Sequence, residues 1–224
     1  MSAPRRSAVA EAVKQHLPGF APDVIFDVGA NVGATALALA GGFPQATIYA
    51  FEPVEETFGT LRRNVSAEER IRPFSLALGR RSRSARMRTH GLSVSNRVAG
   101  WRDYLKSGET VKMTSGDRFC AEHGIERIGF LKIDAEGYDL EVLFGFRKML
   151  RAMRIDMVEA EVGMNPENRR HVPFEWVKTY LERLDYRLFL IHDQRRDTPF
   201  TGRAMVRRSN VVFASSQLIQ APRS

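Results

Sequence analysis

Short apolar runs alternate with longer stretches of mixed polarity along most of the chain. The apolar runs have the length of buried strands and lie at 24–28, 47–51, 71–76, 128–133 and 155–162. The intervening stretches have the apolar spacing of helices, at 33–40, 54–65 and 174–184 and in one segment that starts near Asp139. Strands that alternate with helices predict an α/β fold built on a mostly parallel sheet.

The two ends of the chain extend this pattern. Residues 7–17 are predicted to form a helix, which Pro18 and Gly19 end, within an N-terminal extension of residues 1–22. The apolar runs at 186–191 and 210–214 are predicted to pair as a hairpin across residues 193–208. We therefore expect about seven core strands, the last of them antiparallel, in one domain that covers residues 1–224.

The segment 80–113 interrupts the alternation. Residues 84–88 and 110–113 are predicted to form short edge strands on either side of a polar loop at 91–101. A helix over 115–123 follows, and Ser115 is a suitable N-cap because its hydroxyl can accept a backbone N–H. We interpret 80–113 as an insertion beside the substrate.

The turn after the first strand reads DVGANVG, from Asp27 to Gly33. Gly29 allows a tight turn, Gly33 allows the next helix to sit close to the strand, and the free N–H groups of that helix can hold an anion. Position 31 is Asn, so the turn does not match the G-x-G-x-x-G pattern of dinucleotide sites. A ligand with one small anionic group fits better, and the carboxylate of S-adenosylmethionine is such a group.

Glu52 ends the second apolar strand and lies 23 positions after Gly29. An acidic residue at this place in the fold can accept both ribose hydroxyls of a bound nucleoside. The alternative is a surface glutamate beside a helix start. The apolar strand before Glu52 and Pro53 after it favour the ribose contact.

The strand at 128–133 runs into the segment FLKIDAEGY, which carries several charged residues. Lys132 and Asp134 share a face because side chains alternate along a strand, and a buried Lys132 needs an ionic or hydrogen-bonding partner. Asp134 and Glu136 are expected at the carboxyl tip of the sheet. Alternatively, Asp134 caps the following helix.

The next strand places Glu159 and Glu161 on one face. We expect a structural ion pair there, from Glu161 to Lys132 or an arginine, ahead of a Mg²⁺ site. His192 follows the strand at 186–191 and is a candidate general base. The remaining histidines are assigned to loops or helix ends, and their spacing gives no structural zinc site.

Charge and cysteine content add few restrictions. The formal net charge is +8, and the densest cluster contains Arg80, Arg81, Arg83, Arg86 and Arg88. Such runs are usually solvated surface, although an anion site is the alternative. The single cysteine, Cys120, excludes an internal disulfide and is typical of a reducing cytoplasm. We find neither a secretory signal nor an apolar stretch of about 20 residues that could span a membrane.

Five motifs in order make the chain resemble the FkbM family of S-adenosylmethionine-dependent methyltransferases, from about Val24 to Phe213. They are DVGANVG from Asp27, FEP from Phe51, LALG from Leu76, GLSVS from Gly91 and LKIDAEG from Leu131. The resemblance implies a Rossmann-like class I methyltransferase fold, with helices on both faces of a seven-stranded sheet. It also implies O-methylation of a hydroxyl on a sugar, a polyketide or another secondary metabolite.

The resemblance also implies roles for particular residues. Those expected at the cofactor are Asp27, Gly29, Asn31 and Gly33 at the methionine part, Glu52 with Pro53 at the ribose, and Ala77 and Leu78 at the adenine. Asp134 and Glu136 would lie near the methyl group, where either could act as the general base, with His192 as the outside candidate. One departure is TSGD at 114–117, where the family usually has Thr-Leu-Asp.

Other functions are weighed against this one. Asn31 and the LKIDAEG motif disfavour an NAD-dependent oxidoreductase. A nucleic-acid-binding protein that uses the basic surface is also disfavoured, because basic and aromatic residues are not interleaved as in a single-strand groove. N-methylation, dependence on a divalent metal and assembly into a homo-oligomer stay open.

Overall fold

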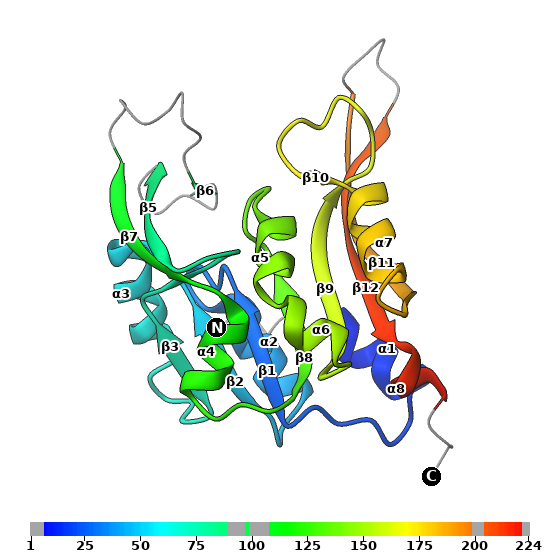
Figure 1. The fold of residues 1–224 in the computed structure, drawn as a ribbon, viewed down its shortest axis with the longest axis horizontal. Coiled ribbons are helices and arrows are strands. Elements are labelled where there is room, and N and C mark those ends of the chain that lie inside the picture. Colours follow the sequence, from blue (N-terminus) through cyan, green and yellow to red (C-terminus); the bar gives the residue numbers. More distant parts are fainter. Residues whose placement is uncertain (1–6, 89–96, 99–107, 199–203, 221–224) are drawn as a thin grey trace.

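A computed structural model of the chain describes residues 7–88, 97–98, 108–198 and 204–220. Its main sheet has the strand order β11-β12-β9-β8-β1-β2-β3, and the short β10 pairs with the end of β9 (Figure 1). The strands are β1 (Val24–Val28), β2 (Thr47–Phe51), β3 (Ile71–Phe74), β8 (Ile128–Ile133), β9 (Ile155–Gly163), β10 (Val172–Pro173), β11 (Tyr186–Asp197) and β12 (Met205–Ser215).

The last strand alone runs against its neighbours on the main path of this sheet. β12 pairs antiparallel with β9 on one side and with β11 on the other, whereas β3, β2, β1, β8 and β9 pair parallel. The prediction of a seven-stranded, mostly parallel sheet with an antiparallel last strand is confirmed.

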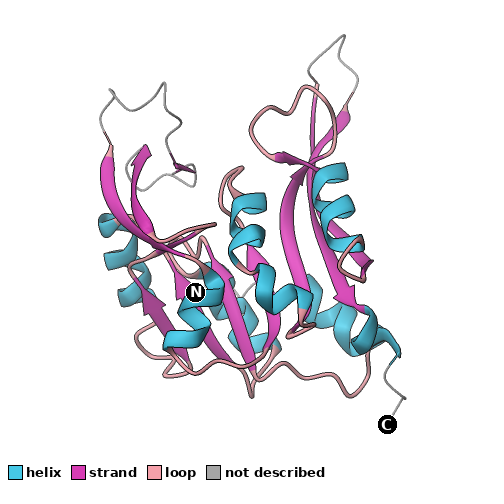
Figure 2. Cartoon of the chain, viewed as in Figure 1, coloured by secondary structure: helices cyan, strands magenta, loops and turns pink. Residues whose placement is uncertain are grey.

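Helices cover both faces of the main sheet, as Figure 2 shows. They are α1 (Ala8–His16), α2 (Ala34–Gly42), α3 (Glu55–Asn64), α4 (Gly116–Glu122), α5 (Asp139–Gly145), α6 (Arg147–Arg151), α7 (Phe174–Glu182) and α8 (Ser216–Gln220). Within the described ranges, no helix combines the length and the apolar character needed to cross a membrane.

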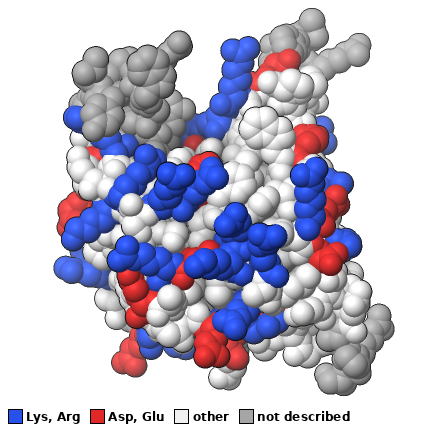
Figure 3. Space-filling model, in the orientation of Figure 1, with Lys and Arg blue, Asp and Glu red and all other residues white. Residues whose placement is uncertain are grey.

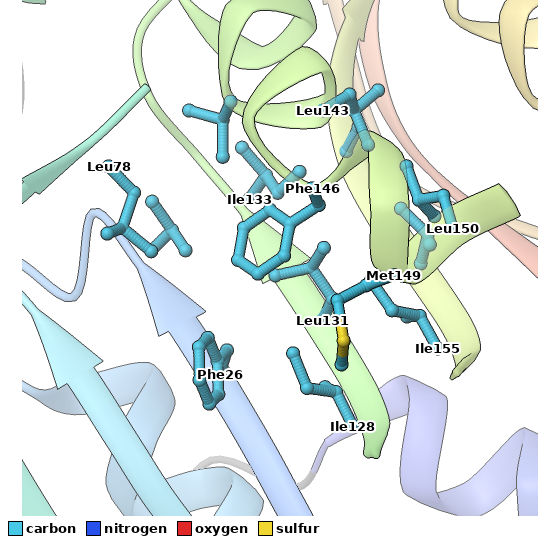
Figure 4. Packing of buried hydrophobic residues seen from close by; sticks show 14 of the residues in the cluster. Phe26, Leu78, Ile128, Leu131, Ile133, Leu143, Phe146, Met149, Leu150 and Ile155 are labelled. Carbon is cyan, nitrogen blue, oxygen red and sulfur yellow. The ribbon is translucent and has the colours of Figure 1, made fainter. Parts of the chain in front are cut away.

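Strand alternation divides the buried apolar residues into two cores. Phe26 and Leu131 face the core under α4, α5, α6 and α7, and Phe146 belongs to the same core (Figure 4). Their neighbours Ile25 and Phe130 face the second core, under α1, α2 and α3. Burial on both faces explains why the central strands are continuously apolar.

A second, smaller sheet has the order β4-β7-β5-β6. Its strands are β4 (Ala77–Leu78), β5 (Arg83–Arg88), β6 (Arg97–Val98) and β7 (Glu109–Thr114). The predicted edge strands correspond to β5 and β7. Most of the polar loop between them, including the GLSVS motif, lies outside the described residues.

The predicted elements differ from the observed ones in three places. The third strand ends at Phe74, because Leu76 N–H turns back to the Phe74 carbonyl (3.0 Å), and Ala77 and Leu78 join the second sheet. The helix that starts near Asp139 breaks at Phe146 into α5 and α6. The last two strands extend beyond 191 and before 210, so His192 lies within β11 and not after a strand.

Candidate active site

A cleft of about 830 Å³ opens at the carboxyl ends of the central strands. One end is bordered by residues that follow β1 and β2 and by β4, namely Gly29, Ala30, Asn31, Glu52, Pro53, Ala77 and Leu78. The other end is bordered by polar residues from β8 onward, namely Asp134, Glu136, Glu159, Glu161, Arg170, His171, His192, Arg207, Arg208 and Asn210. The cleft therefore joins nearly all residues singled out from the sequence.

The glycine turn is shaped by close backbone packing between β1 and the end of β8. Gly29 has φ +78°, and a Cβ there would overlap the carbonyl oxygen of Asp134. Asp134 N–H donates to the Val28 carbonyl (2.9 Å), which continues the parallel pairing of the two strands. Only glycine can occupy this position without moving one strand away from the other.

Glu52 is buried at the end of β2, where both carboxylate oxygens accept backbone N–H groups. Oε2 accepts from Asn31 N–H (3.1 Å) and Oε1 from Val54 N–H (3.0 Å), so Glu52 holds the glycine turn and the start of α3 together. Burial raises the pKa of Glu52 to about 7, although the two N–H groups oppose the rise. Near neutral pH the Glu52 carboxyl can therefore be either protonated or ionised.

Lys132 forms a buried ion pair across the strands. Its Nζ lies 3.3 Å from Asp27 Oδ1 and 3.4 Å from Asp134 Oδ2, so Lys132 has acidic partners, with Asp27 in place of Glu161. Burial opposes the charge of Lys132, but attraction from Asp27, Asp134 and Glu159 outweighs it and raises the pKa of the amine. Burial also raises the pKa of Asp27, and Lys132 limits that rise.

Glu136 and Glu161 are each held by an arginine. Arg170 donates to Glu136 Oε2 through Nε (2.9 Å) and through Nη2 (2.6 Å), and Arg208 pairs with Glu161. The arginine partner of Glu161 agrees with the expected structural ion pair. Asp134 does not cap α5, since no side chain makes a capping bond there.

The buried imidazole of His171 joins this group. Its Nε2 lies 2.8 Å from Glu161 Oε2 and its Nδ1 lies 3.0 Å from Asn168 Oδ1. One ligand atom each from Glu136, Glu161 and His171 lie within 4.8 Å of one another, which would suit a divalent cation. Because two arginines already neutralise the carboxylates, the ion-pair network stays the favoured interpretation over Mg²⁺.

His192 and Glu159 form a second polar pair across β11, β12 and β9. His192 Nε2 lies 3.5 Å from Glu159 Oε1, and Asn210 Nδ2 donates to the same oxygen (2.7 Å). Burial lowers the pKa of His192, but the nearby Glu159 carboxylate outweighs this effect, so the pKa is raised overall.

Some site residues differ from their assignments. His171, Arg170 and Asn210 line the cleft but carry no recognisable motif, since each reaches it only through folding of distant segments. Asp27 and Gly33 do not line the cleft. Asp27 is fully buried, and Gly33 is the N-cap of α2 and packs against Leu61 of α3.

Comparison with known families decides the relationship. The family model described as "Methyltransferase FkbM domain" matches residues 27–188, most of the chain. The chain belongs to the FkbM methyltransferase family. The match covers both the glycine turn and the LKIDAEG motif, which lie on the two sides of the cleft.

The curated relatives that the chain matches are distant. The hexuronic acid methyltransferase AglP of Haloferax volcanii is 28% identical over 65% of this chain and 59% of its own. The 31-O-demethyl-FK506 methyltransferase FkbM of Streptomyces tacrolimicus is 33% identical over 55% of this chain and 59% of its own. The chain thus matches about three-fifths of the length of these relatives.

Solved structures show the same fold at low identity. The precorrin-6y C5,15-methyltransferase of Geobacter metallireducens has a TM-score of 0.50 at 10% identity, covering 96% of this chain and 93% of its own. TrmK of M. capricolum, solved with S-adenosylhomocysteine, has a TM-score of 0.50 at 11% identity, covering 94% and 69%. These likenesses support the Rossmann-like class I methyltransferase architecture.

Proposed function

We propose that this FkbM-family chain is an S-adenosylmethionine-dependent O-methyltransferase that acts on a hydroxyl of a small polar molecule, a sugar being favoured. The observation that carries the proposal is the division of one cleft into two chemically different ends. One end offers a tight glycine turn and one carboxylate, and the other offers charged and polar side chains in hydrogen-bonding networks.

The first end suits a nucleoside attached to a small anionic group. Glu52 is fixed by Asn31 and Val54 N–H groups, so its remaining lone pairs can accept ribose hydroxyls without a change in side-chain position. Ala77 and Leu78 supply an apolar border for a flat base. This combination supports S-adenosylmethionine over a dinucleotide, whose pyrophosphate needs a second glycine at position 31.

The second end favours a sugar over an apolar polyketide. Its borders are mainly carboxylates, guanidinium groups, imidazoles and an amide, and Ala135 and Tyr138 add apolar and aromatic surface after β8. Buried polar groups bind hydroxyl-rich ligands and reject ligands that leave them unpaired. The relative named as a hexuronic acid methyltransferase is consistent with such an acceptor.

Methyl transfer requires alignment of the acceptor oxygen with the methyl carbon and removal of the hydroxyl proton. S-adenosylmethionine supplies the methyl group on a sulfonium. Asp134 follows β8 at the polar end of the cleft, and the Lys132 ammonium pairs with its carboxylate. In the proposed mechanism, Asp134 accepts the hydroxyl proton, and Glu136, tied to Arg170, helps to position the acceptor.

Calorimetry and a methyl-uptake screen test the function. We expect the chain to bind S-adenosylmethionine and S-adenosylhomocysteine but not NADH, and to methylate hydroxyl-rich sugars or uronic acids in preference to apolar macrolides. Binding of NADH, or absence of cofactor binding, would contradict the proposed enzyme class. Uptake by amines alone would show N-methylation.

Replacement of the three candidate bases separates their roles. We expect Asp134→Asn to lower kcat about 100-fold or more, the usual contribution of a general base, while cofactor affinity is retained. Glu136→Gln should mainly raise KM, and His192→Gln should preserve most of the turnover. Steady-state kinetics as a function of pH, together with cofactor calorimetry, measure these effects. If His192→Gln instead causes the largest loss of kcat and changes the pH profile, the general base is His192 paired with Glu159.

Cofactor affinity is expected to depend on pH through Glu52. With a pKa of about 7, the carboxyl is mostly protonated at pH 6 and mostly ionised at pH 8, and the ionised form accepts ribose hydroxyls better. S-adenosylmethionine should therefore bind up to about tenfold more weakly at pH 6 than at pH 8. In Glu52→Gln, the affinity for S-adenosylmethionine should be low at both pH values. If calorimetry shows that the variant keeps the pH dependence of the unmodified chain, Glu52 is not the cause of that dependence.

A further inference from the structure

A second cavity of about 780 Å³ lies outside the cleft and shares no lining residue with it. Five cationic residues line this cavity, which we call the basic groove: Arg80, Arg81, Arg118, Arg147 and Lys148. They come from the segment after β4, from α4 and from α6. Figure 3 shows Lys and Arg gathered over the face on which α4, α5 and α6 lie.

Close packing between backbones brings these segments together. A Cβ at Gly145, the last residue of α5, would overlap the carbonyl oxygen of Gly79, and a Cβ at Gly116, at the start of α4, would overlap the Phe146 ring. Asp117 further fixes α6 to α4, since its carboxylate accepts the N–H groups of Lys148 (2.9 Å) and Met149 (3.0 Å). The backbone segments that carry the cationic side chains are therefore packed tightly against one another.

Much of the positive charge in the basic groove is uncompensated. Arg118 pairs with Glu122 (2.6 Å), and Arg80 lies 3.9 Å from Glu141. Across the residues that the structure describes, Arg81, Arg147 and Lys148 have no acidic partner within ion-pair distance. The one acid that lines the groove, Asp117, is engaged by the backbone of α6.

The wall of the groove also contains a polar group without a partner. Tyr180 packs edge-on against Phe144, with ring centroids 5.0 Å apart, and Arg80 lies 5.0 Å over the Phe144 ring. The Tyr180 hydroxyl is shielded from solvent and has no hydrogen-bond partner among the described residues. Because buried hydroxyls are nearly always hydrogen-bonded, the unpartnered Tyr180 hydroxyl indicates a bound ligand that accepts a hydrogen bond from it.

We propose that the basic groove binds the phosphate groups of a small phosphorylated molecule, with a diphosphate as the preferred group. Guanidinium groups bind phosphate oxygens through paired hydrogen bonds, and a diphosphate brings enough negative charge for several cations at once. The Tyr180 hydroxyl donates to one of its oxygens. The groove is lined by residues of α4, α5, α6 and α7, and its volume of about 780 Å³ is in the range of small-molecule sites, which favours a small ligand over a nucleic-acid strand.

Calorimetric titration of the full chain with sodium pyrophosphate tests the proposal. We expect binding that weakens as salt is added, because exposed charges are screened. The double variant Arg147→Gln with Lys148→Gln should weaken binding about tenfold or more, as expected for loss of charge-assisted hydrogen bonds. Tyr180→Phe should weaken it severalfold without loss of folded stability, which a purely structural hydroxyl would not do.

A matched control removes equal charge elsewhere. Arg62→Gln with Arg63→Gln changes two exposed arginines on α3, outside the groove, and should leave pyrophosphate affinity unchanged. Circular dichroism verifies that every variant folds. No pyrophosphate binding by the unmodified chain, or equal losses in the groove and control variants, would overturn the proposal. So would a single-stranded RNA oligonucleotide that binds the groove more tightly than pyrophosphate and is lost with the same variants.

Discussion

Gly29→Ala is expected to destabilise the protein by about 4 kcal/mol or more and to abolish cofactor binding. The added methyl group would overlap the Asp134 carbonyl oxygen, so β1 and β8 would have to separate at the point where the cleft begins. The left-handed φ of +78° adds a further cost for any residue with a Cβ. Urea unfolding measures the loss of stability, and calorimetry measures the loss of binding.

Gly124→Ala is the matched control for this variant. Gly124 also has a left-handed φ, +65°, but a Cβ there meets no atom within 4 Å. We expect a loss of about 1 kcal/mol from the backbone conformation alone, with cofactor affinity unchanged. Equal losses in the two variants would show that the contact with Asp134 is unimportant.

Lys132→Met is expected to cost about 3 to 5 kcal/mol, because it leaves Asp27 buried and without its cation. The pKa of Asp27, already raised by burial, should rise further, so the folded state would bind a proton that the unfolded state has released. The destabilisation should therefore be largest at high pH and decrease as the pH falls towards the ordinary carboxyl range. Urea unfolding at several pH values gives this dependence.

The double variant Asp27→Asn with Lys132→Met isolates the pair. Removing the charge of Asp27 should recover part of the stability lost in Lys132→Met and should remove its pH dependence, because no buried charge is then left without a partner. If the double variant loses as much unfolding free energy as Asp27→Asn and Lys132→Met lose in sum, the two charges do not interact.

Strands buried on both faces were predictable because their apolar runs end abruptly at polar residues. The bounds predicted for β1, β2 and β8 match the structure residue for residue. The far ends of β11 and β12 were missed because they leave the core: from His192 to Asp197 the strand is largely exposed on both sides, so the sequence has no apolar period there. Pairing between the two strands, which is not local information, continues the strands there.

The two ends of the cleft differ in how far local sequence patterns predict them. The glycine turn, Glu52 and Asp134 lie directly after apolar strands, and parallel strands bring their carboxyl ends to one edge, so topology alone predicts their meeting. His171 and Asn210 reach the cleft by other means. The first depends on the loop before β10, and the second on which strand β12 joins, and neither is encoded in a local pattern.

Because of the position of β12, the residues at the two ends of the cleft become available at different times during synthesis. β12 lies between β9 and β11, so β11 has no place in the sheet until the chain through Ser215 has been made. The glycine turn and Glu52 follow β1 and β2, which are synthesised much earlier. A nascent chain therefore contains every residue of the glycine-turn end, from Gly29 to Leu78, before it contains Asn210, and β11 with His192 can join the sheet only after β12 has been made.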